Sequence, residues 1–156
     1  SDKATKVHFI EGVSHLTLTD TESLDLALID QIEAPNSHEV VALLCDEGVS
    51  YLFPGDTEGR ALKEIPFSSK VDILLAPHHG SKNSWDEAFY KKYQPQLVVA
   101  SAGVDNRFHH PHQEVVEGLA KLGYQLLQTP KGGAVYFYQE GKVLAYQRAL
   151  PEEGDD

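Results

Sequence analysis

Residues 71–81 read VDILLAPHHGS, a short apolar run that ends in proline, two adjacent histidines, glycine and serine. The apolar part predicts a strand over 71–75, and similar runs predict strands over 40–45 and 97–100. These strands are too apolar for a sheet that keeps one face in water. Open α/β sheets place their sites beyond the ends of apolar strands, so the polar residues found there are the first candidates for a functional site.

The rest of the chain predicts a run of strands, then alternating strands and helices, then a closing hairpin. Ser84 and Glu87 stand at capping-box spacing, which predicts a helix from Ser84 to Tyr93. The pattern is typical of an α/β (α+β) fold, a mixed sheet with helices on one face. The predicted strands are 6–10, 15–19, 25–30, 38–45, 49–53, 71–75, 97–100, 124–127, 134–138 and 142–146, and the predicted helices are 57–64, 84–93 and 111–122.

Length and charge limit the classes of function. We expect one domain over residues 1–150 and an acidic, disordered tail over 151–156. The net charge is −11 and no basic run occurs, which argues against stable nucleic-acid binding by this segment alone. No apolar run is long enough to cross a bilayer, so we expect a soluble domain. The opening residues Ser1-Asp2-Lys3 look like an arbitrary start, so we expect the domain to be part of a longer protein. The single cysteine, Cys45, lies in an apolar run and is interpreted as a buried strand residue.

Asp56 follows the apolar strand 49–53 through Pro54 and Gly55. A carboxylate held rigidly at a strand end suits a bridging metal ligand. The alternative makes Asp56 the N-cap of the helix predicted next, and on the local pattern alone the N-cap is favoured.

Histidines form two further clusters at strand ends. His78 and His79 are adjacent, and because neighbours in an extended segment point opposite ways, we expect only one of them to face a site. His109, His110 and His112 follow the strand 97–100 and precede a predicted helix. Imidazoles suit Zn or Mn ligation and proton transfer, whereas the alternative for the pair is a solvated turn.

Other aromatic and imidazole side chains have simpler interpretations. His8, His15 and His38 have no partners at metal-ligand spacing, and we assign them to the surface or to strand packing. Trp85 is interpreted as a core anchor, because few basic residues flank it.

Taken in order, three motifs resemble one family. They are FPGD at 53–56, VDILLAPHHGSKNS at 71–84, and SAGVDNRFHHP at 101–111 followed by Glu114-Val115-Val116. Together they resemble the metallo-β-lactamase-type hydrolase domain of bacterial ComEC competence DNA-uptake proteins, from about Val40 to about Phe137. The resemblance implies the second half of a four-layer αββα sandwich with two metals.

The resemblance also implies roles for particular residues. Asp56 would be the bridging metal ligand, and His110 a metal ligand or phosphate contact. One of His78 and His79 would be a ligand, or a phosphate contact and general acid. The cofactor would be a divalent metal, Zn or Mn, and no organic cofactor site is expected.

The sequence departs from the family in its ligand set. The family's His-x-(His or Asp)-x-Asp-His loop does not occur here. Three positions also differ: His109 replaces a usual glycine, Pro54 a small hydroxyl residue, and Glu39 stands near an expected serine. Asp56 and one or two histidines cannot fill two metal sites. We therefore expect a nearly inactive chain, either because the first half lies elsewhere or because this half has lost catalysis.

The leading hypothesis is part of a metal-dependent phosphodiesterase or nuclease linked to competence. Its partners would be the missing N-terminal half of the domain or a second copy, with DNA and the membrane reached through the parent protein. One alternative is a non-catalytic interaction or dimerisation module, because half a sandwich exposes an apolar sheet face. Another is a hydrolase of small esters or lactones, because fold does not fix substrate.

Overall fold

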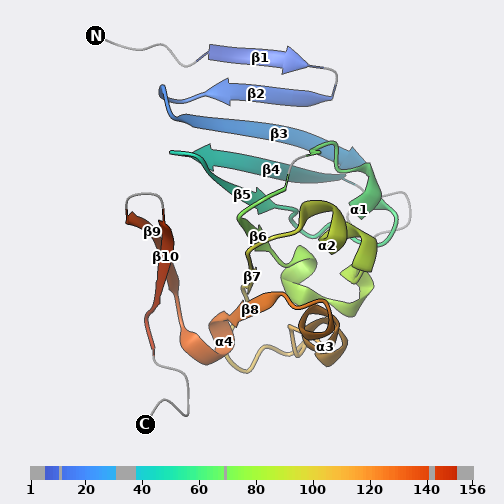
Figure 1. Cartoon of the computed structure of the whole chain (residues 1–156). Helices are drawn as coiled ribbons and strands as arrows, with labels where there is room; N and C mark the ends of the chain where they lie inside the picture. The colour runs from blue at the N-terminus through green and yellow to red at the C-terminus, as the bar shows by residue number, and fades with distance from the viewer. Residues whose placement is uncertain (1–5, 11, 31–37, 69, 141–142, 151–156) are drawn as a thin grey trace.

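The computed structural model describes residues 6–10, 12–30, 38–68, 70–140 and 143–150. Eight of its strands form one sheet in which every strand lies beside its neighbours in the chain, from β1 to β8 (Figure 1). The strands β1 to β5 are antiparallel, and β5 to β8 are parallel. The strands of this sheet are β1 (Lys6–Ile10), β2 (Val13–Thr17), β3 (Glu22–Asp30), β4 (His38–Asp46), β5 (Val49–Phe53), β6 (Ile73–Leu75), β7 (Leu97–Ala100) and β8 (Gln125–Gln128).

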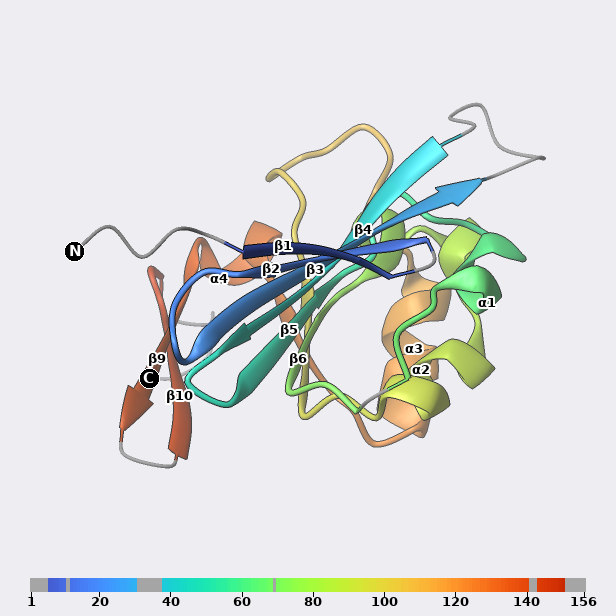
Figure 2. The same ribbon diagram turned by 90° about the horizontal axis from the view of Figure 1, so that it is seen from above.

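Helices cover one face of the sheet, and a hairpin lies on the other side (Figure 2). The covering helices are α1 (Ala61–Glu64), α2 (Glu87–Tyr93) and α3 (Gln113–Lys121). The hairpin pairs β9 (Val135–Glu140) with β10 (Val143–Arg148), and the short α4 (Thr129–Gly132) precedes it. The predicted mixed α+β architecture with helices on one face is thus confirmed, whereas the αββα likeness stays a prediction.

Two apolar cores explain why the central strands are apolar on both faces. The larger core lies under the helices and includes Leu74 and Val98. The smaller core contains Ile73, Leu97 and Val99, with Phe137 of the hairpin packed against it. Alternate residues of β6 and β7 therefore enter different cores. The hairpin covers the smaller core, whereas the sequence led us to expect a second copy or the missing half of the domain as the cover.

Two predicted helix starts are wrong. The helix α2 begins after Asp86, whose side chain accepts hydrogen bonds from the backbone N–H groups of Ala88 (2.8 Å) and Phe89 (3.1 Å). Ser84 instead ends the 3-10 turn η2 (Lys82–Ser84), so the predicted capping box does not form. The helix α1 begins at Ala61 with Arg60 at the N-cap, which removes the N-cap interpretation of Asp56.

The simpler interpretations can also be compared with the structure. Trp85 is partly buried against the larger core and stacks on Tyr90 at 5.2 Å between ring centroids, which confirms its packing role. His15 pairs with Asp25 on the neighbouring strand. Cys45 lies in β4 and is only partly buried. The side chain of His8 and the tail 151–156 lie outside what the structure describes.

Among the described residues, no helix is long and apolar enough to cross a membrane.

Candidate functional site

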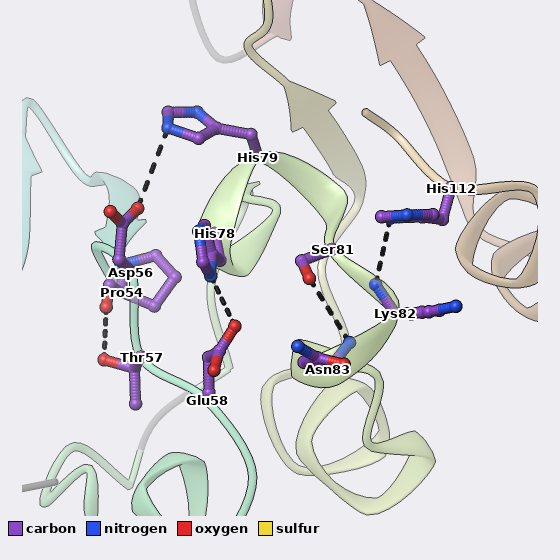
Figure 3. A network of polar contacts seen from close by, with 10 residues as sticks. All are labelled: Pro54, Asp56, Thr57, Glu58, His78, His79, Ser81, Lys82, Asn83 and His112. Atoms are coloured by element: carbon purple, nitrogen blue, oxygen red, sulfur yellow. Dashed lines mark hydrogen bonds and ion pairs between the residues drawn. The ribbon is translucent and has the colours of Figure 1, made fainter. Parts of the chain in front are cut away.

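The candidate site is built from three segments that follow β5, β6 and β7. These strands are parallel, so their C-terminal ends meet at one edge of the sheet. The first segment carries Asp56, the second is the turn η1 (Pro77–Gly80), and the third is the loop 101–112. Figure 3 shows Asp56 and His79 facing one another across this edge. The residues predicted from three separate motifs are therefore brought together.

The backbone of η1 explains how adjacent histidines share one site. His78 and His79 both adopt the left-handed conformation, with φ of 47° and 58°. The ring of His110 lies 5.6 Å from that of His78 and 6.2 Å from that of His79, measured between centroids. The expectation that only one histidine faces the site assumed an extended segment, and the left-handed backbone shows that this assumption is wrong. Non-glycine residues rarely adopt positive φ, and such strain concentrates at functional sites.

His78 is held by a carboxylate that the sequence analysis missed. Its Nδ1 lies 2.5 Å from Oε1 of Glu58, whose side chain is only 19% exposed. A hydrogen bond from Nδ1–H to Glu58 leaves Nε2 as the nitrogen available to a ligand. The available signal was a second acidic residue two positions after Asp56.

His79 lies between a carbonyl and a carboxylate. Its Nδ1 is 2.7 Å from the backbone oxygen of Ser101, so Nδ1 must carry the proton and donate it. Its Nε2 faces Oδ1 of Asp56 at 3.7 Å. In neutral His79 a lone pair on Nε2 would face the carboxylate, which is unfavourable. A proton on Nε2, or a cation shared by the two groups, makes the contact attractive.

His110 is positioned through its backbone by Asn106. The Asn106 side chain accepts from the N–H of His110 at 2.8 Å and donates to the carbonyl of His110 at 2.8 Å. Burial lowers the pKa of His110, the neighbouring imidazoles of His112, His78 and His79 lower it further, and Asp56 opposes them. A neutral imidazole is the form that binds a metal.

The other two histidines of the third cluster have different positions. His112 is the N-cap residue of α3, and its Nδ1 lies 3.3 Å from the backbone N–H of Lys82. Its ring also lies 4.8 Å from that of His110. His109 is exposed and has a φ of 57°. The cluster therefore contributes His110 directly, with His112 beside it.

The motifs imply a divalent metal, and the side chains that would bind it are Asp56 and the neighbouring histidines. A carboxylate and imidazoles are donors that Zn and Mn accept. Within the described ranges, however, no three side chains of His, Cys, Asp or Glu are placed to hold a metal ion. The donors thus fit the metal in type, but those described do not complete a site.

Known proteins resemble the chain over most of its length. It is 32% identical over 124 residues to ComE operon protein 3 of Bacillus subtilis (strain 168), which covers 78% of this chain and 16% of that protein. It is 34% identical over 112 residues to Recombination protein 2 of Haemophilus influenzae, covering 69% of this chain and 14% of that protein. It is 35% identical over 106 residues to Competence protein ComA of Neisseria gonorrhoeae, covering 65% of this chain and 15% of that protein.

These similarities link the chain to competence-related bacterial proteins at modest identity. The chain spans only 14–16% of the length of these relatives. No protein-family model matches it.

Proposed function

We propose that this chain contributes the second half of a metal-dependent phosphodiesterase site to a larger protein of bacterial competence. The observation that carries the proposal is the convergence of Asp56, His78, His79 and His110 at one edge of the sheet. The parallel strands bring the three segments to one edge, and the carboxylate and imidazoles that a metal-dependent phosphodiesterase uses stand together there.

His78 and His79 would be the groups that bind and protonate a phosphodiester. Glu58 fixes the tautomer of His78, so that its Nε2 side is presented to the ligand. The carbonyl of Ser101 fixes His79 in the same way, and a protonated Nε2 would lie beside Asp56. With a proton on Nε2 as well as on Nδ1, a histidine so placed can donate a hydrogen bond to a phosphate oxygen and the Nε2 proton to a leaving oxygen.

Asp56 and His110 would contribute ligands to a divalent Zn or Mn ion. The remaining ligands would belong to the missing first half of the domain, and we derive no step through the metal. The isolated chain is accordingly expected to bind metal weakly and to hydrolyse little or nothing.

DNA is the proposed substrate class of the whole protein. Support comes from the names of the relatives, which refer to competence and to recombination. The net charge of −11 indicates that this chain does not hold long DNA through phosphate contacts of its own. Other parts of the protein would hold the strand, while this segment would act on one phosphodiester.

The test is Asp56→Ala in the full-length protein, with hydrolysis of DNA and of bis(p-nitrophenyl) phosphate as readouts. Loss of a bridging carboxylate should remove several kcal/mol of transition-state stabilisation, roughly 1,000-fold in rate or more, with little change in the melting temperature. Asp105→Asn, an exposed carboxylate in the loop after β7, is the control and should retain activity. An Asp56→Ala protein that cleaves at a near wild-type rate would refute the proposal.

One further observation favours an interaction module as a second candidate. Leu28 and Val40 face one another on β3 and β4 and are 62% and 57% exposed. Both side chains lie on the face of the sheet that carries the smaller core. Val40 and Leu44 are four residues apart in β4 and so point to the same face, and Leu44 pairs with Tyr51, which packs against that core. The missing half of the domain, or a second copy, would cover this part of the sheet.

A further inference from the structure

Beside the histidines, the loop 101–112 presents an exposed aromatic ring. Phe108 is 57% exposed, and its ring stacks on His110 at 5.7 Å between centroids with 21° between the planes. The guanidinium carbon of Arg107 lies 4.6 Å from the centroid of the Phe108 ring. His110 in turn stacks on His79 at 6.2 Å and 26°. A row of stacked rings therefore runs from Phe108 in the loop through His110 to His79 in the candidate site.

The loop is held by side-chain hydrogen bonds in which the exposed ring takes no part. Asn106 performs that task, because its side chain bridges the carbonyls of Gly103 (3.1 Å) and His110 (2.8 Å) and accepts from the N–H of His110. An exposed phenylalanine carries an unfavourable hydration cost that the loop could avoid with a polar residue. Its position next to the site therefore suggests a role in binding.

We propose that Arg107 and Phe108 form a platform on which a base of single-stranded nucleic acid stacks, with the neighbouring phosphodiester directed toward His110 and His79. The inference rests on the proposed phosphodiesterase function and adds the requirement for an unstacked base. Aromatic rings and guanidinium planes are the groups on which proteins stack splayed-out bases. Duplex DNA, whose bases are already stacked, would not use the platform.

The net charge of the chain determines the solution conditions under which stacking of a base on the platform can be measured. The chain carries a net charge of −11, and Asp105 stands two residues before Arg107, so the chain as a whole repels a polyanion. Arg107 supplies a cation within the platform itself. Binding should therefore be measured with short oligonucleotides at an ionic strength of about 0.1 M or more, where salt screens the repulsion between the chain and the phosphates and the contribution of the base stands out.

The experiment compares two labelled tetranucleotides by fluorescence anisotropy with the 156-residue chain. One is a thymidine tetramer, and the other has the same phosphates but no bases. The wild type should bind the thymidine tetramer roughly five-fold or more tightly than the abasic one. Phe108→Ala should abolish this preference without changing abasic binding, and Phe108→Tyr should retain it. Val104→Ala, at an exposed apolar residue of the same loop, is the matched control and should change neither.

Equal binding of both tetramers by the wild type, or an unchanged preference in Phe108→Ala, overturns the platform. Absence of binding to either tetramer also overturns it for this chain. The parent function is judged separately, by hydrolysis of bis(p-nitrophenyl) phosphate in the full-length protein. If both proposals hold, Phe108→Ala loses the base preference, Val104→Ala keeps the hydrolysis of bis(p-nitrophenyl) phosphate, and Asp56→Ala loses that hydrolysis.

Discussion

Gly80 is the contact point between the two histidine segments, and Gly80→Ala tests how tightly they are packed. Its φ is +84°, and an added Cβ would lie 2.6 Å from Cβ of Pro111 and 3.1 Å from its Cα. Left-handed backbone costs an alanine about 1–2 kcal/mol. The clash should add about 1–3 kcal/mol, because a rigid proline ring cannot rotate away. Together these effects should lower the free energy of unfolding by about 2–5 kcal/mol.

Gly123→Ala separates the two contributions. Gly123 has a similar φ of +77°, but nothing lies within 4 Å of its added Cβ. Urea denaturation should therefore show only the backbone cost of about 1–2 kcal/mol for Gly123→Ala. Proton spectra of the histidine rings should also shift in Gly80→Ala, because η1 moves away from His110. Equal losses of stability in the two variants would refute the close packing of η1 against Pro111.

Three further outcomes are expected. Asp86→Ala should lower the free energy of unfolding by about 1 kcal/mol, since it removes the N-cap of α2; an unchanged urea midpoint would contradict this. Burial, chiefly, raises the pKa of the Cys45 thiol, so at pH 8 a disulfide reagent should modify it more slowly in the folded chain than in urea, and equal rates would be inconsistent with the structure. Leu28→Lys should weaken self-association, because it places a charge on the exposed apolar part of the sheet. Sedimentation equilibrium measures this, and a strictly monomeric wild type would contradict the prediction.

The strands were easier to predict than the helix starts. Long apolar runs such as 38–45 and 97–100 correspond to β4 and β7, because burial on one or both faces determines their composition. The start of a helix was harder to predict, because several nearby residues of the sequence could each serve as its N-cap. Asp86 caps α2 by accepting two backbone hydrogen bonds, whereas Ser84 ends the preceding turn. Local spacing cannot choose between such competitors, because tertiary packing decides where the turn before the helix lies.

The candidate site could be predicted as a set of strand-end clusters but not as a geometry. Parallel strands bring the segments after β5, β6 and β7 to one edge, so the meeting of Asp56 with His79 follows from topology. The left-handed backbone of His78 and His79 does not follow from composition, since only a small fraction of non-glycine residues adopts it. Glu58 was missed for the same reason, because its role depends on where the turn directs His78.

The sequential strand order has a consequence for synthesis of the protein. Every strand from β1 to β8 pairs with the strand made just before it, so no segment must wait for a later one to be inserted between its neighbours. Short separations between paired strands favour rapid folding, and a growing chain can extend its sheet as it leaves the ribosome. Asp56 would be positioned first, then the histidine pair, then His110. If translation paused between β6 and β7, the chain made so far would already be correctly paired, with β6 as an exposed edge strand ready to pair with β7.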